Sequence, residues 1–171
     1  MGKKNTIDST PIGNIISRFS TSHTTSTNKL IHYITIPIVS FSVLAIVWAI
    51  PFPHLDFLGK FNGFVNWASF LIAGTVYYYY RMSPFLTYGI LILVFAFSAL
   101  IVSLEKFHLR GGPELHIIPM ALLLPALLAQ VAGHRGERTQ PDASSSFRSL
   151  LDGPLWLMNI IFRKAGLLKS R

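Results

Sequence analysis

The segment SHTTSTNKLIHYITIP, residues 22–37, joins a polar stretch rich in hydroxyl side chains to a long apolar one. Three polar residues, His23, Asn28 and His32, lie at this boundary. Burying an imidazole or amide group without a hydrogen-bonding partner costs roughly 2–7 kcal/mol. We therefore expect these side chains either to carry a function or to face water at the start of a membrane helix.

The composition places the chain among membrane proteins. Of its 171 residues, 51% are hydrophobic and only 13% are charged, whereas soluble domains carry about 25% charged residues. The chain contains no cysteine, which excludes disulfide scaffolds and thiolate metal sites. Its net charge of +8 is typical of a membrane protein that contacts anionic headgroups, and we expect no nucleic-acid partner.

Four apolar stretches are long enough to cross a bilayer, which takes about 20 helical residues. They cover approximately residues 30–50, 64–80, 84–104 and 115–132. A shorter segment, residues 154–168, begins at Pro154, and we predict that it forms an interfacial amphipathic helix.

The fold class that follows is an all-α integral membrane protein with four transmembrane helices and a C-terminal interfacial amphipathic helix. A single helical membrane domain covers residues 23–168. The N-terminal segment, residues 1–22, is polar, and we predict that it is flexible.

The basic residues predict the orientation. With four spans, all but Lys60, Lys106 and Arg110 of the 15 Lys and Arg residues fall on one side, which the positive-inside rule assigns to the cytoplasm together with both termini. The same topology sorts the histidines into two groups of three. The cytoplasmic group contains His23, His32 and His134. The group on the opposite side contains His54, His108 and His116.

Residue spacing brings the cytoplasmic group together. Asn28 and His32 are four apart and share one helix face. His23 precedes His32 by nine residues, which would place it on the opposite face of a continuous helix, so it must lie on a segment that folds back. At the end of the fourth span, Gln130 and His134 are also four apart, and Glu137 follows.

This set of side chains suits a divalent metal. Three neutral imidazoles with a carboxylate nearby can bind Fe(II) or Zn(II), and amide side chains can orient them. We therefore predict metal ligation by His23, His32 and His134. The residues that we expect to support the bound cofactor are Asn28, Gln130 and Glu137.

Simpler interpretations of the same residues stay open. His23 can be solvated within its Ser/Thr-rich segment, and His32 can reach the interface. Glu137 can belong to a solvated cluster with Arg135 and Arg138. The histidines of the opposite face can form a second site, although their neighbouring prolines and charges favour loop roles.

Three stretches resemble a known membrane family. HTTSTNKLIHYITIP (residues 23–37) resembles its entry motif, in which two histidines flank an asparagine. QVAGHRGERTQP (residues 130–141) resembles its second motif, and LLDGPLWLMNIIF (residues 150–162) resembles its closing segment. The characterised members of this family are Fe(II)-dependent 2-hydroxy fatty acid dioxygenases that act in fatty-acid α-oxidation.

The resemblance implies an Fe(II) site in which His23, His32 and His134 are the catalytic ligands. It places Asn28, Glu137 and Pro141 at accompanying motif positions. The implied reaction takes a lipid substrate, a 2-hydroxy fatty acid, and O2, and yields CO2 and a fatty acid one carbon shorter. The implied location is the endoplasmic reticulum in a eukaryote or the inner membrane in a bacterium.

The second motif departs from the family pattern. The run from His134 to Glu137 is one residue shorter than usual, and TQPDASSS around Pro141 replaces the usual sequence. An alternative function is therefore a non-catalytic lipid-binding or assembly protein that keeps the family fold. A transporter or channel is a weaker alternative, because the four spans contain no charged residue to line a polar pathway.

Overall fold

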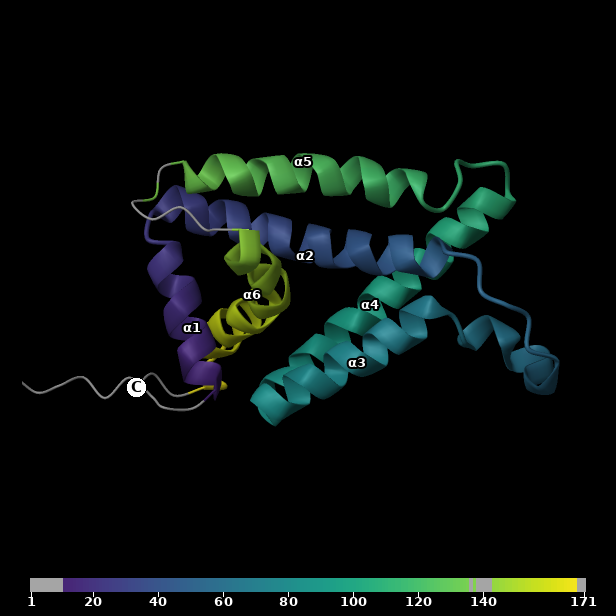
Figure 1. Ribbon diagram of the computed structural model, residues 1–171, viewed down its shortest axis with the longest axis horizontal. Coiled ribbons are helices and arrows are strands. Elements are labelled where there is room, and N and C mark those ends of the chain that lie inside the picture. Colours follow the sequence, from purple (N-terminus) through teal and green to yellow (C-terminus); the bar gives the residue numbers. More distant parts are fainter. Residues whose placement is uncertain (1–10, 136, 138–142, 169–171) are drawn as a thin grey trace, which may run out of the picture.

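The computed structural model describes residues 11–135, 137 and 143–168 and confirms the all-α class (Figure 1). Over these residues the chain forms six α-helices and one 3-10 helix, η1. In chain order they are α1 (Pro11–Ser22), α2 (Ser26–Ala49), η1 (Asp56–Phe64), α3 (Trp67–Met82), α4 (Pro84–Leu109), α5 (Ile117–His134) and α6 (Ala143–Lys164).

Three of these helices, α2, α4 and α5, are long and apolar enough to cross a membrane, which suggests an integral membrane protein. The remaining predicted span, residues 64–80, corresponds to α3, which has 16 residues. At 1.5 Å per residue this helix is about 24 Å long, shorter than the roughly 30 Å of a bilayer core. Four membrane crossings therefore stay a prediction.

Local signals in the sequence explain where α2 begins. The side chain of Thr25 accepts a hydrogen bond from the backbone N–H of Asn28 and caps the helix, as hydroxyl residues do at helix starts. The helix therefore begins at Ser26, earlier than the predicted apolar span. As a result, Asn28 and His32 both lie in its first two turns.

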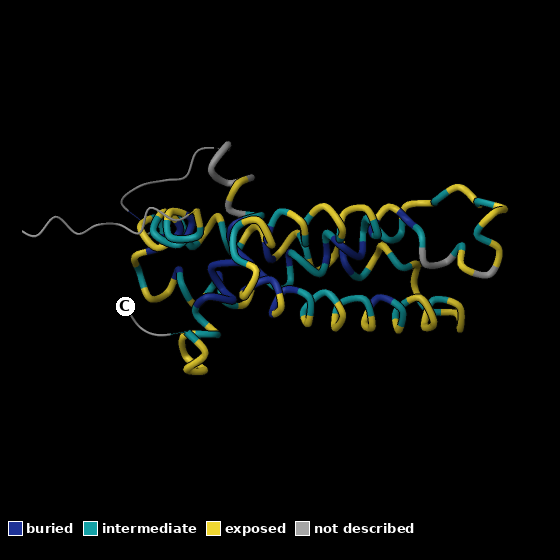
Figure 2. The backbone as a smooth tube through the Cα atoms, turned by 90° about the horizontal axis from the view of Figure 1, so that it is seen from below, coloured by how far each residue is buried: buried dark blue, intermediate teal, exposed yellow. Residues whose placement is uncertain are grey.

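The helices form a wedge (Figure 1). Helices α2 and α5 run antiparallel and side by side, and the α3–α4 hairpin crosses α2 near one end, where Leu44, Ala45, Ala68 and Ile101 pack together. Toward the other end the hairpin and α2 diverge, and α1 and α6 lie there. Figure 2 shows that buried residues gather toward the middle of the molecule while outward-facing turns are exposed.

The second half of the N-terminal segment differs from the prediction. Residues 11–22 form helix α1, whose Ile15 and Phe19 are buried. These two residues are four apart and form an apolar stripe that packs on α6. Such a short stripe is hard to recognise without knowledge of the partner helix that covers it. Residues 1–10 lie outside the described residues.

Helix α6 is also different from the predicted interfacial helix. It begins at Ala143 rather than at residue 154, and Pro154 lies inside it. Eight consecutive residues, Asp152 to Asn159, are buried. A helix on a membrane surface would bury one face only, so α6 is instead enclosed by α1, α2 and α4 at the open end of the wedge.

Candidate metal centre

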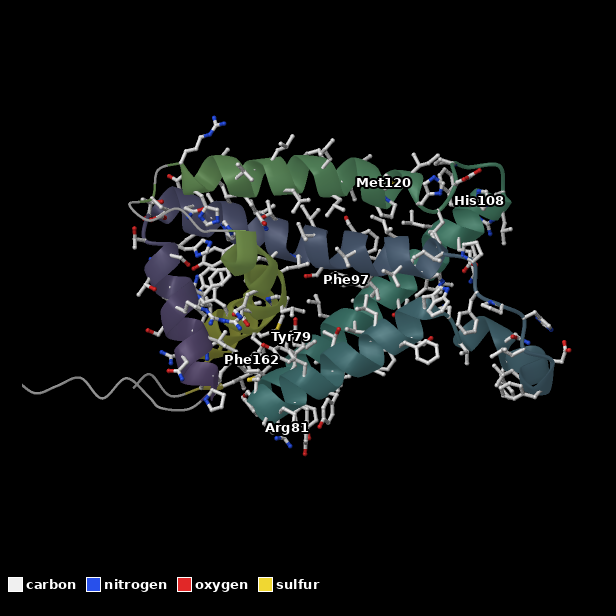
Figure 3. All side chains as sticks on the ribbon, viewed as in Figure 1. Tyr79, Arg81, Phe97, His108, Met120 and Phe162 are labelled. Atoms are coloured by element: carbon white, nitrogen blue, oxygen red, sulfur yellow. The ribbon has the colours of Figure 1, made fainter. Side chains whose placement is uncertain are left out.

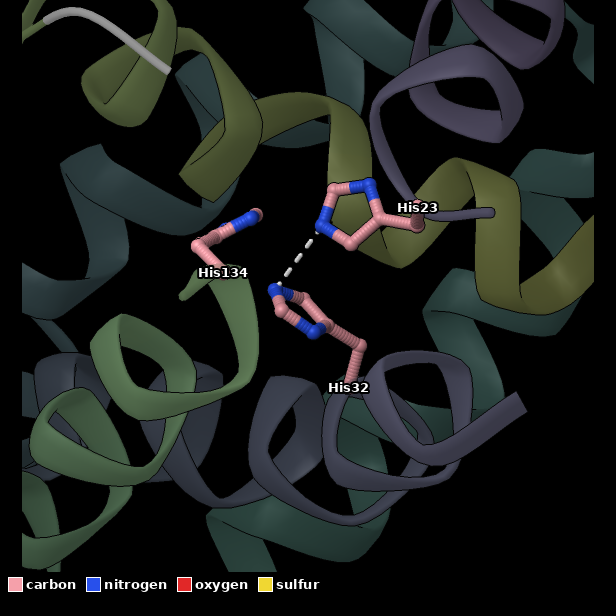
Figure 4. A group of neighbouring side chains, drawn as sticks. All are labelled: His23, His32 and His134. Carbon is pink, nitrogen blue, oxygen red and sulfur yellow. Dashed lines mark hydrogen bonds between the residues drawn. The ribbon is translucent and has the colours of Figure 1, made fainter. Parts of the chain in front are cut away.

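Three elements bring His23, His32 and His134 together, as the residue spacing predicted. His23 occupies the short connection between α1 and α2, His32 lies in α2, and His134 is the last residue of α5. One side-chain nitrogen from each ring lies within 4.8 Å of the other two, and the rings point toward one another (Figure 4). We call these three residues the histidine triad.

The partners of two triad rings assign their protons. The Nδ1 of His23 lies 2.8 Å from the backbone carbonyl of Phe19, and the Nδ1 of His32 lies 3.0 Å from that of Asn28. A carbonyl oxygen can only accept a hydrogen bond, so each Nδ1 carries the proton. In the neutral rings, both Nε2 atoms then have a free lone pair.

These two Nε2 atoms face each other at 3.0 Å, the contact dashed in Figure 4. Two lone pairs at this distance repel unless a cation lies between or beside them. Burial lowers the pKa of His23, which disfavours an extra proton as that cation. A metal ion fits better, because neighbouring nitrogen ligands of a tetrahedral ion with bonds of about 2.0–2.1 Å are about 3.3 Å apart.

His134 completes the triad from the third side. Its ring centroid lies 4.8 Å from that of His23 and 5.1 Å from that of His32. Its Nδ1 is buried and has no hydrogen-bond partner within the described part of the chain. A buried nitrogen without a hydrogen-bond partner is unfavourable for the folded state. Binding of a metal ion by the His134 ring would offset this cost. The donor set therefore fits a metal ion.

Glu137, which we predicted to support the cofactor, holds the segment that carries His23. Its Oε1 accepts hydrogen bonds from the backbone N–H groups of Thr24 and Thr25 and from the side chains of Thr25 and Asn28, and its Oε2 accepts from the Thr24 hydroxyl. These bonds, led by the Thr24 hydroxyl, hold the pKa of Glu137 well below its usual range despite burial. The carboxylate, which follows the end of α5, thereby holds the segment between α1 and α2 that carries His23 and the first turn of α2.

Asn28 is central to this arrangement. Its backbone carbonyl orients His32, and its side-chain amide donates to Glu137 at 2.9 Å. Gly133 on α5 makes room for it, since a Cβ at that position would lie 2.5 Å from the Asn28 Oδ1. Asn28 therefore joins the α2 part of the triad to the end of α5.

Gln130 lies apart from these contacts. It was predicted to support the cofactor with Asn28, but its Nε2 donates to the hydroxyl of Thr35 at 2.9 Å. Thr35 in turn donates to the backbone carbonyl of Ile31. Gln130 therefore links α5 to α2 beside the triad.

An aromatic wall encloses one side of the site and was not predicted. The ring of Phe19 stacks on His23 with centroids 4.2 Å apart and an interplanar angle of 5°. Trp156 of α6 packs against Phe19 at 4.5 Å. The four-residue spacing of Phe19 and His23 was a signal for this contact, but it has meaning only once α1 is known to be helical.

The other three histidines lie at the opposite end of the bundle, where His108 and His116 line one pocket but the three rings form no ligating group within the described residues. His54 lies 3.6 Å from Asp56, and His116 lies 3.4 Å from Glu114, with all four side chains largely exposed. His108, labelled in Figure 3, lies near the carbonyl of Gly112. Within the described residues the triad is the one group of three ligating side chains that can hold a metal. Arg138 and Pro141 lie outside the described residues.

The fold and the site thus define a helical membrane protein with a histidine triad that could hold a metal ion. In comparisons of the chain with protein-family models, curated proteins and solved structures, no match was found.

Proposed function

We propose that the protein is a membrane dioxygenase that binds Fe(II) at the histidine triad and cleaves 2-hydroxy fatty acids. The observation that carries the metal site is the pair of unprotonated Nε2 atoms, 3.0 Å apart, of His23 and His32. The substrate is proposed from the motif resemblance around the same residues. Bound Fe(II) would supply the O2 chemistry that breaks the C1–C2 bond and yields CO2, water and an acid one carbon shorter.

The residues of the chain hold and orient the site in this proposal. Glu137 is not counted among the metal ligands, because its oxygens are occupied by the His23 connection. Three histidine ligands leave further coordination positions for the carboxylate and hydroxyl of a 2-hydroxy acid and for O2. His134 is the least buried ligand, so we expect substrate to approach from its side.

Two cationic side chains near the triad are evidence in favour of an anionic substrate. Lys29 is close enough to interact electrostatically with His23, and Arg135 directly follows His134 and is exposed. Their positive charges favour binding of a carboxylate headgroup near the triad.

A cavity supports the lipid nature of the substrate. It has a volume of about 280 Å³ and lies among α2, α3, α4 and α6. Its lining is almost entirely apolar and includes Tyr79 and Phe97, both labelled in Figure 3. An apolar space of this kind is suited to part of an acyl chain.

Product analysis by mass spectrometry tests the proposal. The full chain, purified in detergent, is supplied with Fe(II), O2 and a long-chain 2-hydroxy fatty acid. We expect an acid one carbon shorter, formed only with iron and lost in His134→Ala. His108→Ala, which changes a histidine at the opposite end of the bundle, should keep the activity.

The alternative, a non-catalytic lipid-binding or assembly protein, predicts a different outcome. The folded chain would then bind lipid, hold no stoichiometric metal and form no product under reducing, iron-replete conditions. A metal-loaded chain without product would contradict the dioxygenase and retain the metal site. A chain with bound lipid but without stoichiometric metal would contradict the dioxygenase and the metal site and would favour the alternative.

We also propose four membrane crossings with both termini in the cytoplasm. The proposal is supported by the direction of α2 and α4, which is the same in Figure 1, with α3 running the opposite way between them. The chain has no cysteine, so single cysteines can be introduced for labelling. In oriented vesicles, Arg81→Cys should react with an impermeant reagent from the cytoplasmic side and Lys106→Cys from the other. Labelling of both from one side would contradict four crossings.

A further inference from the structure

An ion pair between a buried carboxylate and a half-exposed guanidinium joins α1 to α6 near the triad. Asp152 of α6 is only 2% exposed, and its Oδ2 accepts a hydrogen bond from the guanidinium of Arg18 on α1. The Oδ1 accepts from the hydroxyl of Tyr78 at 3.4 Å. A carboxylate at this depth requires such partners, because an unpaired charge is unfavourable in a protein interior.

A short chain of contacts connects this pair to a triad ligand. Asp152 and Trp156 are four residues apart on α6 and therefore share a face. Trp156 packs on Phe19, the residue that follows Arg18 on α1. Phe19 then contacts His23 twice, since its ring stacks on the imidazole and its carbonyl accepts the Nδ1 proton.

The remaining contacts between α1 and α6 do not by themselves define where α1 sits along α6. Helix α1 has 12 residues, a length that is marginal for an isolated helix in water. Its buried Ile15 and Phe19 make apolar contacts, which lack directional preference. A buried carboxylate, by contrast, requires its cationic partner at one position, and specifying register is the best-attested use of buried charged groups.

We infer that the Arg18–Asp152 ion pair is a positioning device for the metal centre. It sets the register of α1 on α6, and thereby places the Phe19 carbonyl that orients the His23 ring. Arg18 and Asp152 are positioning residues and touch no triad ring. The inference rests on the proposed metal site for its functional meaning, but the orientation of His23 can be measured without metal.

The first measurement is made on the metal-free full chain in detergent. Nitrogen NMR of ¹⁵N-histidine protein reports the protonated nitrogen of each imidazole, and His23→Gln identifies the His23 signal. In the wild-type chain we expect His23 as the Nδ1–H form with slowly exchanging hydrogen. In Asp152→Asn and Arg18→Gln we expect a mixture of both forms with fast exchange, whereas Arg18→Lys should retain the wild-type spectrum.

The second measurement is a titration with Co²⁺, whose visible spectrum reports the number and geometry of nitrogen ligands. We expect Asp152→Asn and Arg18→Gln to bind Co²⁺ roughly tenfold or more weakly, as loss of an outer-shell partner commonly does. Their spectra should also change, because His23 is no longer held in the ligand set.

Tyr79→Phe is the matched control. The Tyr79 hydroxyl donates to the backbone carbonyl of Leu151, so this variant loosens α6 from α3 without touching α1. It should keep the His23 signal and the Co²⁺ affinity of the wild-type chain. Circular dichroism monitors the folding of each variant. If Asp152→Asn fails to fold, Arg18→Gln still tests the ion pair, because it changes only a half-exposed side chain.

The outcomes separate the two proposals. A wild-type chain that does not bind Co²⁺ contradicts the metal site, while the NMR comparison still decides whether the ion pair orients His23. An unchanged His23 signal and Co²⁺ spectrum in Arg18→Gln would overturn the positioning role and leave the metal site intact. Equal losses in Tyr79→Phe would also overturn it, because the effect would then be general loosening of α6.

Discussion

Each end of the helical bundle carries three histidines, but only one end assembles them. His23, His32 and His134 come from three elements and lie within 4.8 Å through one nitrogen each. Two histidines at the other end, His54 and His116, are paired with the exposed local partners Asp56 and Glu114. The difference shows that a shared site depends on the buried carbonyl groups that orient His23 and His32 and on helices whose ends lie at the same place.

The largest effect is expected from removal of a triad ring. His32→Ala should weaken metal binding by more than the roughly 10–100-fold that loss of an outer-shell partner costs. The matched change at the other end, His116→Ala, should leave metal affinity unchanged. Metal content after dialysis against a weak chelator measures both. Equal metal retention in the two variants would remove the distinction between the ends.

A smaller effect is expected from the carboxylate that fastens the His23 connection. Glu137→Gln keeps the shape of the side chain but loses the charge that accepts from Thr24, Thr25 and Asn28. We expect roughly 10–100-fold weaker metal binding and a loss of about 2 kcal/mol in stability. Metal titration and denaturant unfolding measure these two quantities.

Glu114→Gln is the control for the carboxylate, since Glu114 is the partner of His116 at the exposed end. It should change neither metal affinity nor stability. If Glu137→Gln behaves in the same way, Glu137 does not position His23.

The close approach of α5 to α2 gives a third comparison. A Cβ on Gly133 would lie 2.5 Å from the Asn28 Oδ1, whereas one on Gly74 of α3 would meet nothing within 4 Å. Gly133→Ala should therefore destabilise the chain by about 1–3 kcal/mol through overpacking. Gly74→Ala should be neutral or slightly stabilising because alanine favours helix. Thermal unfolding monitored by circular dichroism compares the two, and equal midpoints would contradict the close contact.

The smallest expected effect is on the pH dependence of the metal-free chain. Burial lowers the pKa of His23 below its value of 6.5 in the unfolded chain. The folded state then binds fewer protons than the unfolded state, so its stability is complete above about pH 6.5 and falls as the pH decreases below it. His23 contributes a slope of at most about 1.4 kcal/mol per pH unit.

Denaturant unfolding between pH 7 and pH 5 measures this slope. His23→Gln should reduce it, and His108→Gln at the opposite end should leave it unchanged. A wild-type slope that persists in His23→Gln would assign the acid sensitivity to other groups.

Much of this arrangement can be predicted from residue patterns, and the remainder depends on long-range packing. Helical spacing predicts that Asn28 and His32 share a face, and the alternation of spans brings His134 to the same end. The hydrogen bonds of Glu137 could not be predicted, because its partners, Thr24 and Thr25, are more than 100 residues away in the sequence. In a sequence, a carboxylate near histidines can equally be a metal ligand or an acceptor of hydrogen bonds that hold the surrounding segments.

The helices that cover the site were the least predictable. Helix α1 has few apolar residues and is stabilised by α6, so its own sequence carries only a weak helical signal. The pairing of Arg18 with Asp152 spans 134 residues and has no local signature. Pro154 favoured a helix start at that residue, but α6 continues through it and begins at Ala143.

The central claim is that the triad forms a metal centre through its three rings. X-ray absorption at the iron edge of the Fe(II)-loaded full chain tests this most directly, because imidazole ligands give a characteristic scattering pattern that can be counted. We predict one iron per chain with the pattern of three imidazoles, reduced to two in His134→Ala and unchanged in His108→Ala. Iron that is absent, or bound without imidazole scattering, would contradict the account.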